Sequence, residues 1–74
     1  MEVEVRLFAT FRRGRWKNKY FEFEREISIG DILKQLDIEE KELGIALVNG
    51  KNCEIETSLK DGDILALFPP IGGG

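Results

Sequence analysis

The chain has 74 residues, which is enough for one compact domain, because a chain this short buries only about 60% of its surface on folding. Hydrophobic residues make up 42% and charged residues 34%, a globular composition that excludes a disordered polar tract. The formal charge of -3 argues against a nucleic-acid-binding protein, which needs a basic surface to neutralise phosphates.

The sequence gives no sign of a membrane span, a secretory signal or a metal site. No apolar run approaches transmembrane length, and the acidic start around Glu2 and Glu4 lacks the positive region of a signal peptide. A single cysteine, Cys53, excludes an internal disulfide and cannot by itself make a zinc site. We therefore expect a cytoplasmic protein that binds neither membrane nor metal.

A hairpin is predicted at the N-terminus. Val3, Val5 and Leu7 alternate with charged residues, which is typical of a strand with one buried face. Phe21 and Phe23 alternate in the same way, so we expect the chain to return there as an antiparallel neighbour. The two strands would be joined by a long loop.

That loop is strongly basic. Its cations are Arg12, Arg13, Arg15, Lys17 and Lys19. We interpret the segment as a solvated loop, with a partner-binding patch as the alternative.

A helix is predicted to begin after Ser28. Ser28 stands three residues before Asp31, and these two side chains can cap the free N–H groups of a first helical turn. Apolar residues then recur at the i, i+3, i+4, i+7 spacing of one helical stripe, namely Ile29, Ile32, Leu33 and Leu36. We expect this stripe to cover a sheet and residues 37–43 to form a connecting turn.

Three more strands are predicted in the second half. Residues 45–48 form an apolar run, and the Asn49-Gly50 pair after it is typical of a type I′ turn that leads into a weak strand near Cys53. Residues 64–68 are apolar at every position, as in a central strand. Pro69-Pro70 ends that strand, because proline has no N–H for the ladder.

The order strand, strand, helix, strand, strand, strand predicts an α+β fold. Its simplest closure is a mixed sheet of about five strands packed on one main helix, with the first and last strands side by side in parallel. This is the β-grasp, or ubiquitin-like, architecture. We expect residues 1–70 to form this domain and residues 71–74 to form a flexible glycine tail.

The chain lacks the usual catalytic groups. It has no histidine, the side chain whose pKa best suits proton transfer near neutrality. Cys53 therefore has no histidine to deprotonate it, and it stands beside Glu54, which disfavours a thiolate. We expect no active site within the chain itself.

The C-terminal sequence is more informative. After Ile71 come Gly72, Gly73 and Gly74, which would present an α-carboxylate on a narrow arm without side chains. Glycine allows close backbone approach, so such an arm can enter a tight channel in another protein. The alternative is a frayed terminus or a residual linker.

Several segments resemble the MoaD/ThiS family of ubiquitin-like sulfur carriers. They are Leu7-Phe8-Ala9, Val48-Asn49-Gly50-Lys51, Asp61-Gly62-Asp63 and Phe68-Pro69-Pro70-Ile71-Gly72-Gly73-Gly74. The last segment is the most specific, and its Phe-Pro-Pro resembles the small subunit of molybdopterin synthase more than the thiamine-pathway carrier. The stretch at residues 12–16 departs from the family, which more often has a less basic loop there.

The resemblance implies chemistry at Gly74. An E1-like adenylating enzyme would use ATP to activate the Gly74 carboxylate, and a sulfur donor protein would convert the acyl adenylate into a thiocarboxylate. Gly72 and Gly73 would enter the large subunit of molybdopterin synthase, where the sulfur would serve molybdenum cofactor biosynthesis. The chain would be a non-catalytic sulfur-donating subunit with no permanently bound cofactor.

Alternatives remain open at this point. The chain could carry sulfur for thiamine or tungsten-cofactor pathways, or it could be a modifier joined to target lysines through Gly74. An inert interaction domain is the fourth possibility.

Docking on a partner requires a recognition surface. If Val3, Val5 and Leu7 face the helix, Phe8 lies on the opposite face of the sheet, and by the same alternation Ala66 and Phe68 point outward beside it. The predicted partner-binding residues are Phe8, Ala66, Phe68, Pro69, Pro70 and Ile71. The alternative is that the two aromatic residues belong to the edge of the core.

Overall fold

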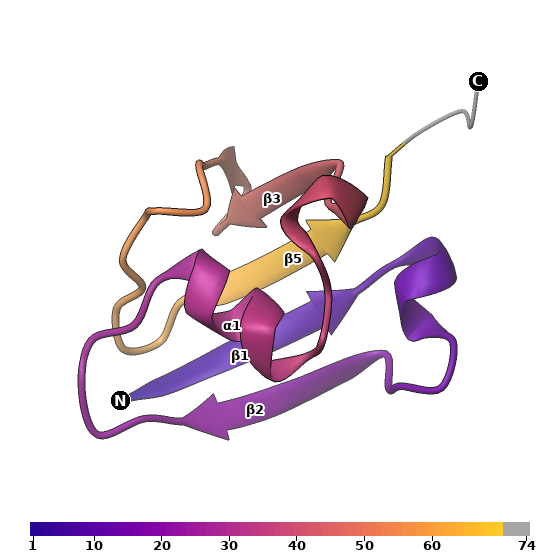
Figure 1. Ribbon diagram of the computed structural model, residues 1–74. Coiled ribbons are helices and arrows are strands. Elements are labelled where there is room, and N and C mark those ends of the chain that lie inside the picture. Colours follow the sequence, from indigo (N-terminus) through magenta and orange to yellow (C-terminus); the bar gives the residue numbers. More distant parts are fainter. Residues whose placement is uncertain (71–74) are drawn as a thin grey trace.

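The computed structural model describes residues 1–70, which form one mixed sheet covered on one face by a helix (Figure 1). The strands are β1 (Glu2–Leu7), β2 (Asn18–Glu22), β3 (Ile45–Val48), β4 (Lys51–Asn52) and β5 (Ile64–Phe68). The helices are α1 (Ile29–Gln35) and the short 3-10 segments η1 (Ala9–Arg12) and η2 (Glu40–Glu42). This is the predicted β-grasp fold, with the two 3-10 segments added.

The sheet has the order β2-β1-β5-β3-β4, with the first and last strands paired in parallel at its centre. Val5 pairs with Leu65 and Leu7 with Leu67. β2 runs antiparallel to β1, and β3 runs antiparallel to β5. The predicted closure is therefore confirmed, and it places the C-terminal end of β5 beside the C-terminal end of β1 (Figure 1).

The core lies between the sheet and α1. The alternating residues of β1 and the apolar stripe of α1 supply most of it, as predicted. Its buried members are Val3, Val5, Leu7, Phe11, Ile29, Ile32, Leu33, Ile38, Ala46, Leu59, Leu65 and Leu67. Leu36, the last residue of the predicted stripe, is half-buried at the C-cap.

The start of α1 is capped as the sequence predicts. The Ser28 Oγ accepts a hydrogen bond from the Asp31 N–H at 3.2 Å, and the Ser28 N–H donates to the Asp31 Oδ2 at 3.0 Å. The bond from the Ser28 N–H holds the pKa of the Asp31 carboxyl below its ordinary value, because it favours the charged form. A helix of only seven residues is marginal alone, so this cap and the packed stripe stabilise it.

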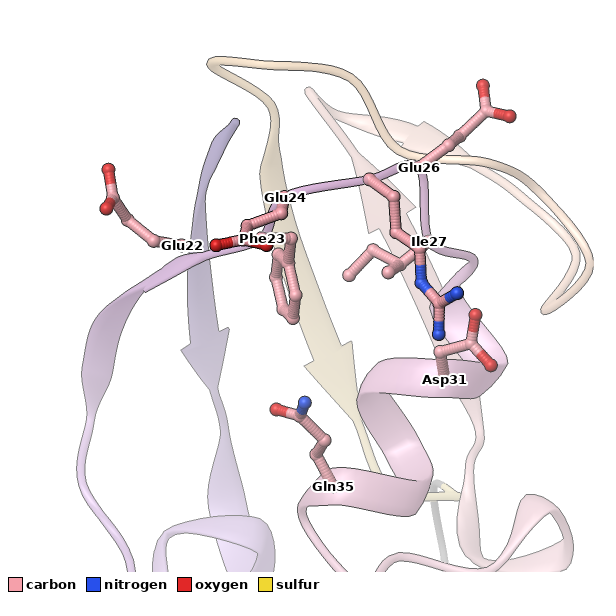
Figure 2. A pocket seen from close by; sticks show the side chains of 8 residues that line it. Glu22, Phe23, Glu24, Glu26, Ile27, Asp31 and Gln35 are labelled. Atoms are coloured by element: carbon pink, nitrogen blue, oxygen red, sulfur yellow. The ribbon is translucent and has the colours of Figure 1, made fainter.

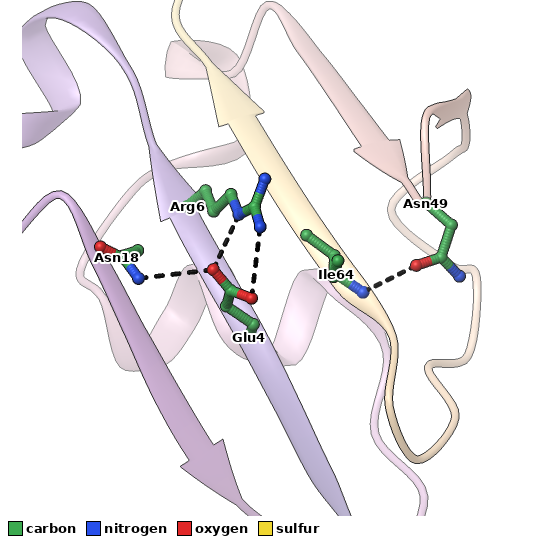
Figure 3. A network of polar contacts seen from close by, with 5 residues as sticks. All are labelled: Glu4, Arg6, Asn18, Asn49 and Ile64. Atoms are coloured by element: carbon green, nitrogen blue, oxygen red, sulfur yellow. Dashed lines mark hydrogen bonds and ion pairs between the residues drawn. The ribbon is translucent and has the colours of Figure 1, made fainter.

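The Asn49-Gly50 turn also forms as predicted. Asn49 has a φ of 52° and Gly50 a φ of 88°, the left-handed conformations that this tight hairpin requires. The Asn49 side chain then reaches the neighbouring strand, where its Oδ1 accepts a hydrogen bond from the Ile64 N–H at 2.9 Å (Figure 3). The turn is thus tied to the start of β5.

The basic segment differs from the solvated loop that we predicted. Arg13, Lys17 and Lys19 are exposed, but Phe11 of η1 is buried in the core at 5% exposure. The Arg15 guanidinium crosses to the end of α1 and donates to the Leu36 carbonyl at 2.9 Å. The interpretation as a solvated loop is therefore wrong for Arg15, and the segment joins the core through the buried Phe11 just before the basic cluster.

No helix within residues 1–70 has the length and apolar character needed to cross a bilayer. The predicted tail, residues 71–74, lies outside the described residues.

Candidate functional site

The C-terminal end of the sheet brings two aromatic rings together. Phe8 follows β1 and Phe68 ends β5, and their rings stack with centroids 4.3 Å apart and planes 10° from parallel. The Phe8 N–H donates to the Leu67 carbonyl at 3.2 Å, which continues the pairing of the two strands. Both rings are half-buried on the face of the sheet opposite α1, as the alternation predicts.

An apolar patch extends from this stack across the open face of the sheet. Phe68 pairs with Ile45 of β3, and Ala66 pairs with Leu47. Directly paired residues point to the same face, so these side chains lie together beside Phe8. We call Phe8, Ile45, Leu47, Ala66 and Phe68 the open-face patch; all of its members are half-buried rather than sealed in the core.

Sequence reasoning found Phe8, Ala66 and Phe68 of this patch but missed Ile45 and Leu47. The signal was present, because residues 45–48 are apolar at every position and a strand with only one buried face would alternate. Combining that run with the outward positions of β5 would have placed Ile45 and Leu47 on the open face.

Polar groups border the patch on the β1 side, where Arg6 pairs with Ala66. Figure 3 shows how Arg6 contacts Glu4, and Glu4 contacts Asn18. The Arg6 Nε donates to the Glu4 Oε2 at 2.7 Å, and the Asn18 amide donates to the same oxygen at 3.4 Å. The bond from Arg6 lowers the pKa of Glu4, because it favours the ionised carboxylate. Glu4 is therefore paired within the sheet.

Besides Arg6, the patch is bordered by Arg12, which contacts the stacked rings. The Arg12 guanidinium lies 5.1 Å from the centre of the Phe8 ring, and its Nε donates to the Leu7 carbonyl at 2.7 Å. A shallow hollow beside the patch is lined by Arg6, Phe8, Arg12 and Lys17 together with Glu4 and Asn18. The patch thus has a rim with an excess of positive charge, on a chain whose net charge is -3.

The structure places two more of the predicted binding residues, Pro69 and Pro70, at the root of the tail. Pro69 is half-buried and Pro70 exposed directly after β5, next to the stacked rings in the chain. Ile71, Gly72, Gly73 and Gly74 lie outside the described residues. Partner binding by Pro69 and Pro70 stays a prediction.

A hollow at the opposite end of the sheet offers less chemistry. It lies between the β2–α1 connection and the helix and is lined by Glu22, Phe23, Glu24, Arg25, Glu26, Ile27, Asp31 and Gln35. Glu22 and Glu26 point away from each other, while Phe23 points inward (Figure 2). Within residues 1–70 no three histidine, cysteine or acidic side chains are arranged to hold a metal ion.

Cys53 is half-buried and packs against the core. The open-face patch and the tail root are therefore the stronger candidate site.

Comparison with known proteins agrees with this geometry. The model of the ThiS family matches residues 5–74, which is nearly the whole chain and includes both the patch and the glycine terminus. The chain belongs to the ThiS family.

Individual relatives place this ThiS-family chain among ubiquitin-like sulfur carriers and modifiers. It is 33% identical to small archaeal modifier protein 3 of Haloferax volcanii over 93 aligned positions that cover all of both proteins. The crystal structure of small archaeal modifier protein 1 from the same organism is 26% identical with a TM-score of 0.76, again with both chains fully covered.

A third relative occurs in an assembly. In a protein–protein complex of subunits 1 and 2 of molybdopterin-converting factor from Helicobacter pylori, the matching chain is 26% identical to this one with a TM-score of 0.68. Both chains are fully covered by the match. A relative of this ThiS-family chain thus pairs with a second subunit.

Proposed function

We propose that this chain is a sulfur carrier for molybdopterin biosynthesis whose sulfur is held as a thiocarboxylate on Gly74. The observation that carries the proposal is the position of the open-face patch. Its residue Phe68 ends β5, only a few residues before Gly72-Gly73-Gly74 in the sequence. An apolar patch on a small domain usually marks an interface. Here it would dock a partner at the point from which the carboxylate is delivered.

The chemistry follows from what the chain contains and lacks. A carboxylate is a poor electrophile, so an E1-like adenylating enzyme would first join Gly74 to AMP from ATP, with pyrophosphate as the leaving group. Sulfide supplied by a donor protein would then attack the acyl carbon, so that a C–S bond forms as the bond to AMP breaks and the thiocarboxylate is left on Gly74. Because the chain has no histidine, the acid and base groups for these steps would come from its partners.

The second partner would be the large subunit of molybdopterin synthase. This assignment is supported by the Helicobacter pylori complex, in which a relative pairs with subunit 2 of molybdopterin-converting factor. The Phe68-Pro69-Pro70 sequence before the glycines supports it as well.

The direct test measures the intact mass of the chain after incubation with its host's adenylating enzyme, ATP and a sulfur donor. Exchange of one oxygen for sulfur is expected, and it should disappear when ATP is omitted. An unchanged mass, in a mixture that loads a known carrier, would rule the proposal out. Copurification with the large subunit would then support the molybdopterin pathway over thiamine or tungsten-cofactor pathways.

A protein modifier is the second candidate, because the relative with 33% identity is a small archaeal modifier protein. In that case Gly74 would be joined to target lysines by isopeptide bonds. Conjugates that survive reducing agent and yield a Gly74–lysine linkage by mass spectrometry are the expected evidence. Both functions use the same activated carboxylate, so one chain can serve both.

A further inference from the structure

The root of the tail is packed against Gly44, the residue just before β3. The Gly44 N–H donates to the Phe68 carbonyl at 2.8 Å, and this hydrogen bond lies at the end of the β3–β5 pairing. Beyond Phe68 the chain continues as Pro69-Pro70, and neither proline has an N–H to donate. The path of these two residues is therefore set mainly by what they touch.

Gly44 is in close contact with that path. A Cβ placed on Gly44 would lie 2.5 Å from the Pro69 carbonyl oxygen, 2.7 Å from the Pro69 carbonyl carbon and 2.7 Å from the Pro70 Cα. Real Cβ atoms do not approach other heavy atoms so closely. All three neighbours are backbone atoms, so no side-chain rotation can relieve the clash.

Backbone conformation does not explain this glycine. Gly14, Gly50 and Gly62 have positive φ angles, whereas Gly44 does not. Gly44 is also exposed, so burial in the core does not exclude a side chain there. The observation that does account for a glycine at this position is the passage of the Pro69–Pro70 backbone across it.

We propose that Gly44 is a positioning residue for sulfur loading: its missing side chain leaves room for the Pro69–Pro70 backbone and so fixes the direction in which the chain leaves the sheet beside the open-face patch. This inference rests on the proposed sulfur-carrier function. Proline fixes φ, so Pro69–Pro70 is a stiff connection, and a side chain at position 44 must displace these two residues together.

The proposal predicts a separation between docking and reaction. A partner that binds the open-face patch meets the same surface whether or not Pro69–Pro70 have moved. The carboxylate, however, must reach the reacting phosphate in a narrow range of positions, and a misplacement of about 1 Å can cost about 10²-fold in rate. Changes at Gly44 should therefore lower kcat for loading and leave KM for the carrier nearly unchanged.

The test compares Gly44→Ala with Gly30→Ala in the full chain, using the host's adenylating enzyme, ATP and a sulfur donor. Gly30 is a matched control, because a Cβ there would meet nothing closer than the Ile55 carbonyl oxygen at 3.5 Å, an ordinary contact. For Gly44→Ala we expect kcat to fall by about tenfold or more, within the range known for small misplacements. For Gly30→Ala we expect wild-type kcat and KM.

A second variant covers the case in which Gly44→Ala fails to fold. Pro70→Gly leaves Gly44 intact and replaces an exposed residue, so the core should be unaffected, but it removes the stiffness after Pro69. A lower kcat is again expected; kcat alone is the readout for this variant, because Pro70 is itself one of the predicted partner-binding residues. Wild-type kinetics for Pro70→Gly, or for a folded Gly44→Ala chain, would overturn the inference.

A structural measurement separates this inference from the proposed function. If the wild-type chain is not loaded, the proposed function fails, and a crystal structure of Gly44→Ala still decides the placement of the tail root. Displacement of Pro69–Pro70 relative to the Phe8–Phe68 stack is expected. Unmoved prolines beside an alanine at position 44 would contradict the inference whatever the loading assay gives.

Discussion

The two faces of the sheet are built from the same strands but differ in what covers them. On the face under α1, Leu65 and Leu67 of β5 are sealed at 0% exposure. On the other face, their neighbours Ala66 and Phe68 are half-buried, and Phe68 is covered partly by Phe8. One strand thus contributes alternately to the core and to the open-face patch.

This difference indicates a division of roles between neighbouring residues. The covered face supplies the buried apolar area that stabilises a short chain, since each large side chain sealed there contributes about 1.5–3 kcal/mol. The open face keeps apolar groups where a partner can bury them. Mutations one residue apart on β5 should therefore have different consequences, and the following experiments test that separation from the largest expected effect to the smallest.

The largest effect is expected outside both faces, at the C-terminus. Deletion of Gly74 should abolish sulfur loading, because the terminal carboxylate then belongs to Gly73 and lies about 3.5 Å, one extended residue, short of the position that would be activated. The melting temperature should stay at the wild-type value, because the core within residues 1–70 does not include Gly74. Intact-mass analysis and thermal unfolding measure the two quantities, and wild-type loading of the truncated chain would refute the role of Gly74.

Leu67→Ala should destabilise the fold by opening a cavity on the covered face of the sheet. Leu67 is fully buried, so the substitution leaves a cavity and should lower the free energy of unfolding by about 2–5 kcal/mol. Urea unfolding followed by tryptophan fluorescence from Trp16 measures the loss. Leu33→Ala on α1, which is 2% exposed, should behave similarly. A loss no larger than that of an exposed-residue mutant would mean that this face is not the core.

Phe68→Ala tests the open face of the sheet, one residue away from Leu67. Loss of the ring removes half of the Phe8–Phe68 stack and should weaken binding to the adenylating enzyme or the large subunit by about 1–3 kcal/mol. Its effect on unfolding should be smaller than that of Leu67→Ala, since the ring is only half-buried. Calorimetric titration with each partner measures the affinity. Unchanged affinity for both partners would show that the patch is not the docking surface.

The smallest effect is expected at the cap of α1, away from the open face. The pKa of Asp31 is lowered in the folded chain, so its ionised form stabilises the fold above its unfolded pKa of about 3.9, and this stability is lost as the pH falls through the lower folded value. Asp31→Asn should therefore flatten the decline of the melting temperature in acid. A parallel decline in the variant and the wild type would contradict this. Loading near neutral pH should be unaffected.

The sequence predicted the covered face of the sheet well, because strands, helix caps and tight turns are each specified by residues close together in the chain. The alternation of Val3, Val5 and Leu7 follows directly from strand geometry. The pair Ser28 and Asp31 and the pair Asn49-Gly50 each carry their own structural signal within four residues. The parallel pairing of β1 with β5 then followed from topology.

The features that sequence reasoning missed depend on contacts between distant segments. Phe11 is buried although it sits in a basic stretch, because η1 folds back over the end of the core. Arg15 reaches Leu36, 21 residues away in the chain. Gly44 looks like an ordinary turn glycine until Pro69 is seen against it. None of these contacts has a periodic pattern, so only the assembled structure reveals them.

The central position of β5 also bears on the order of events during synthesis. Within residues 1–70, β5 is the last strand to be made, yet it bridges β1 and β3, and the β1–β5 contacts close a loop of nearly the whole domain. Such long-range pairing forms late and slowly. A nascent chain that stops before Ile64 therefore has two unpaired strand edges and lacks the part of the open-face patch that β5 supplies. Under the proposed function, completion of the open-face patch and synthesis of Gly74 are thus coupled, so unfinished chains should be poor substrates for an adenylating enzyme.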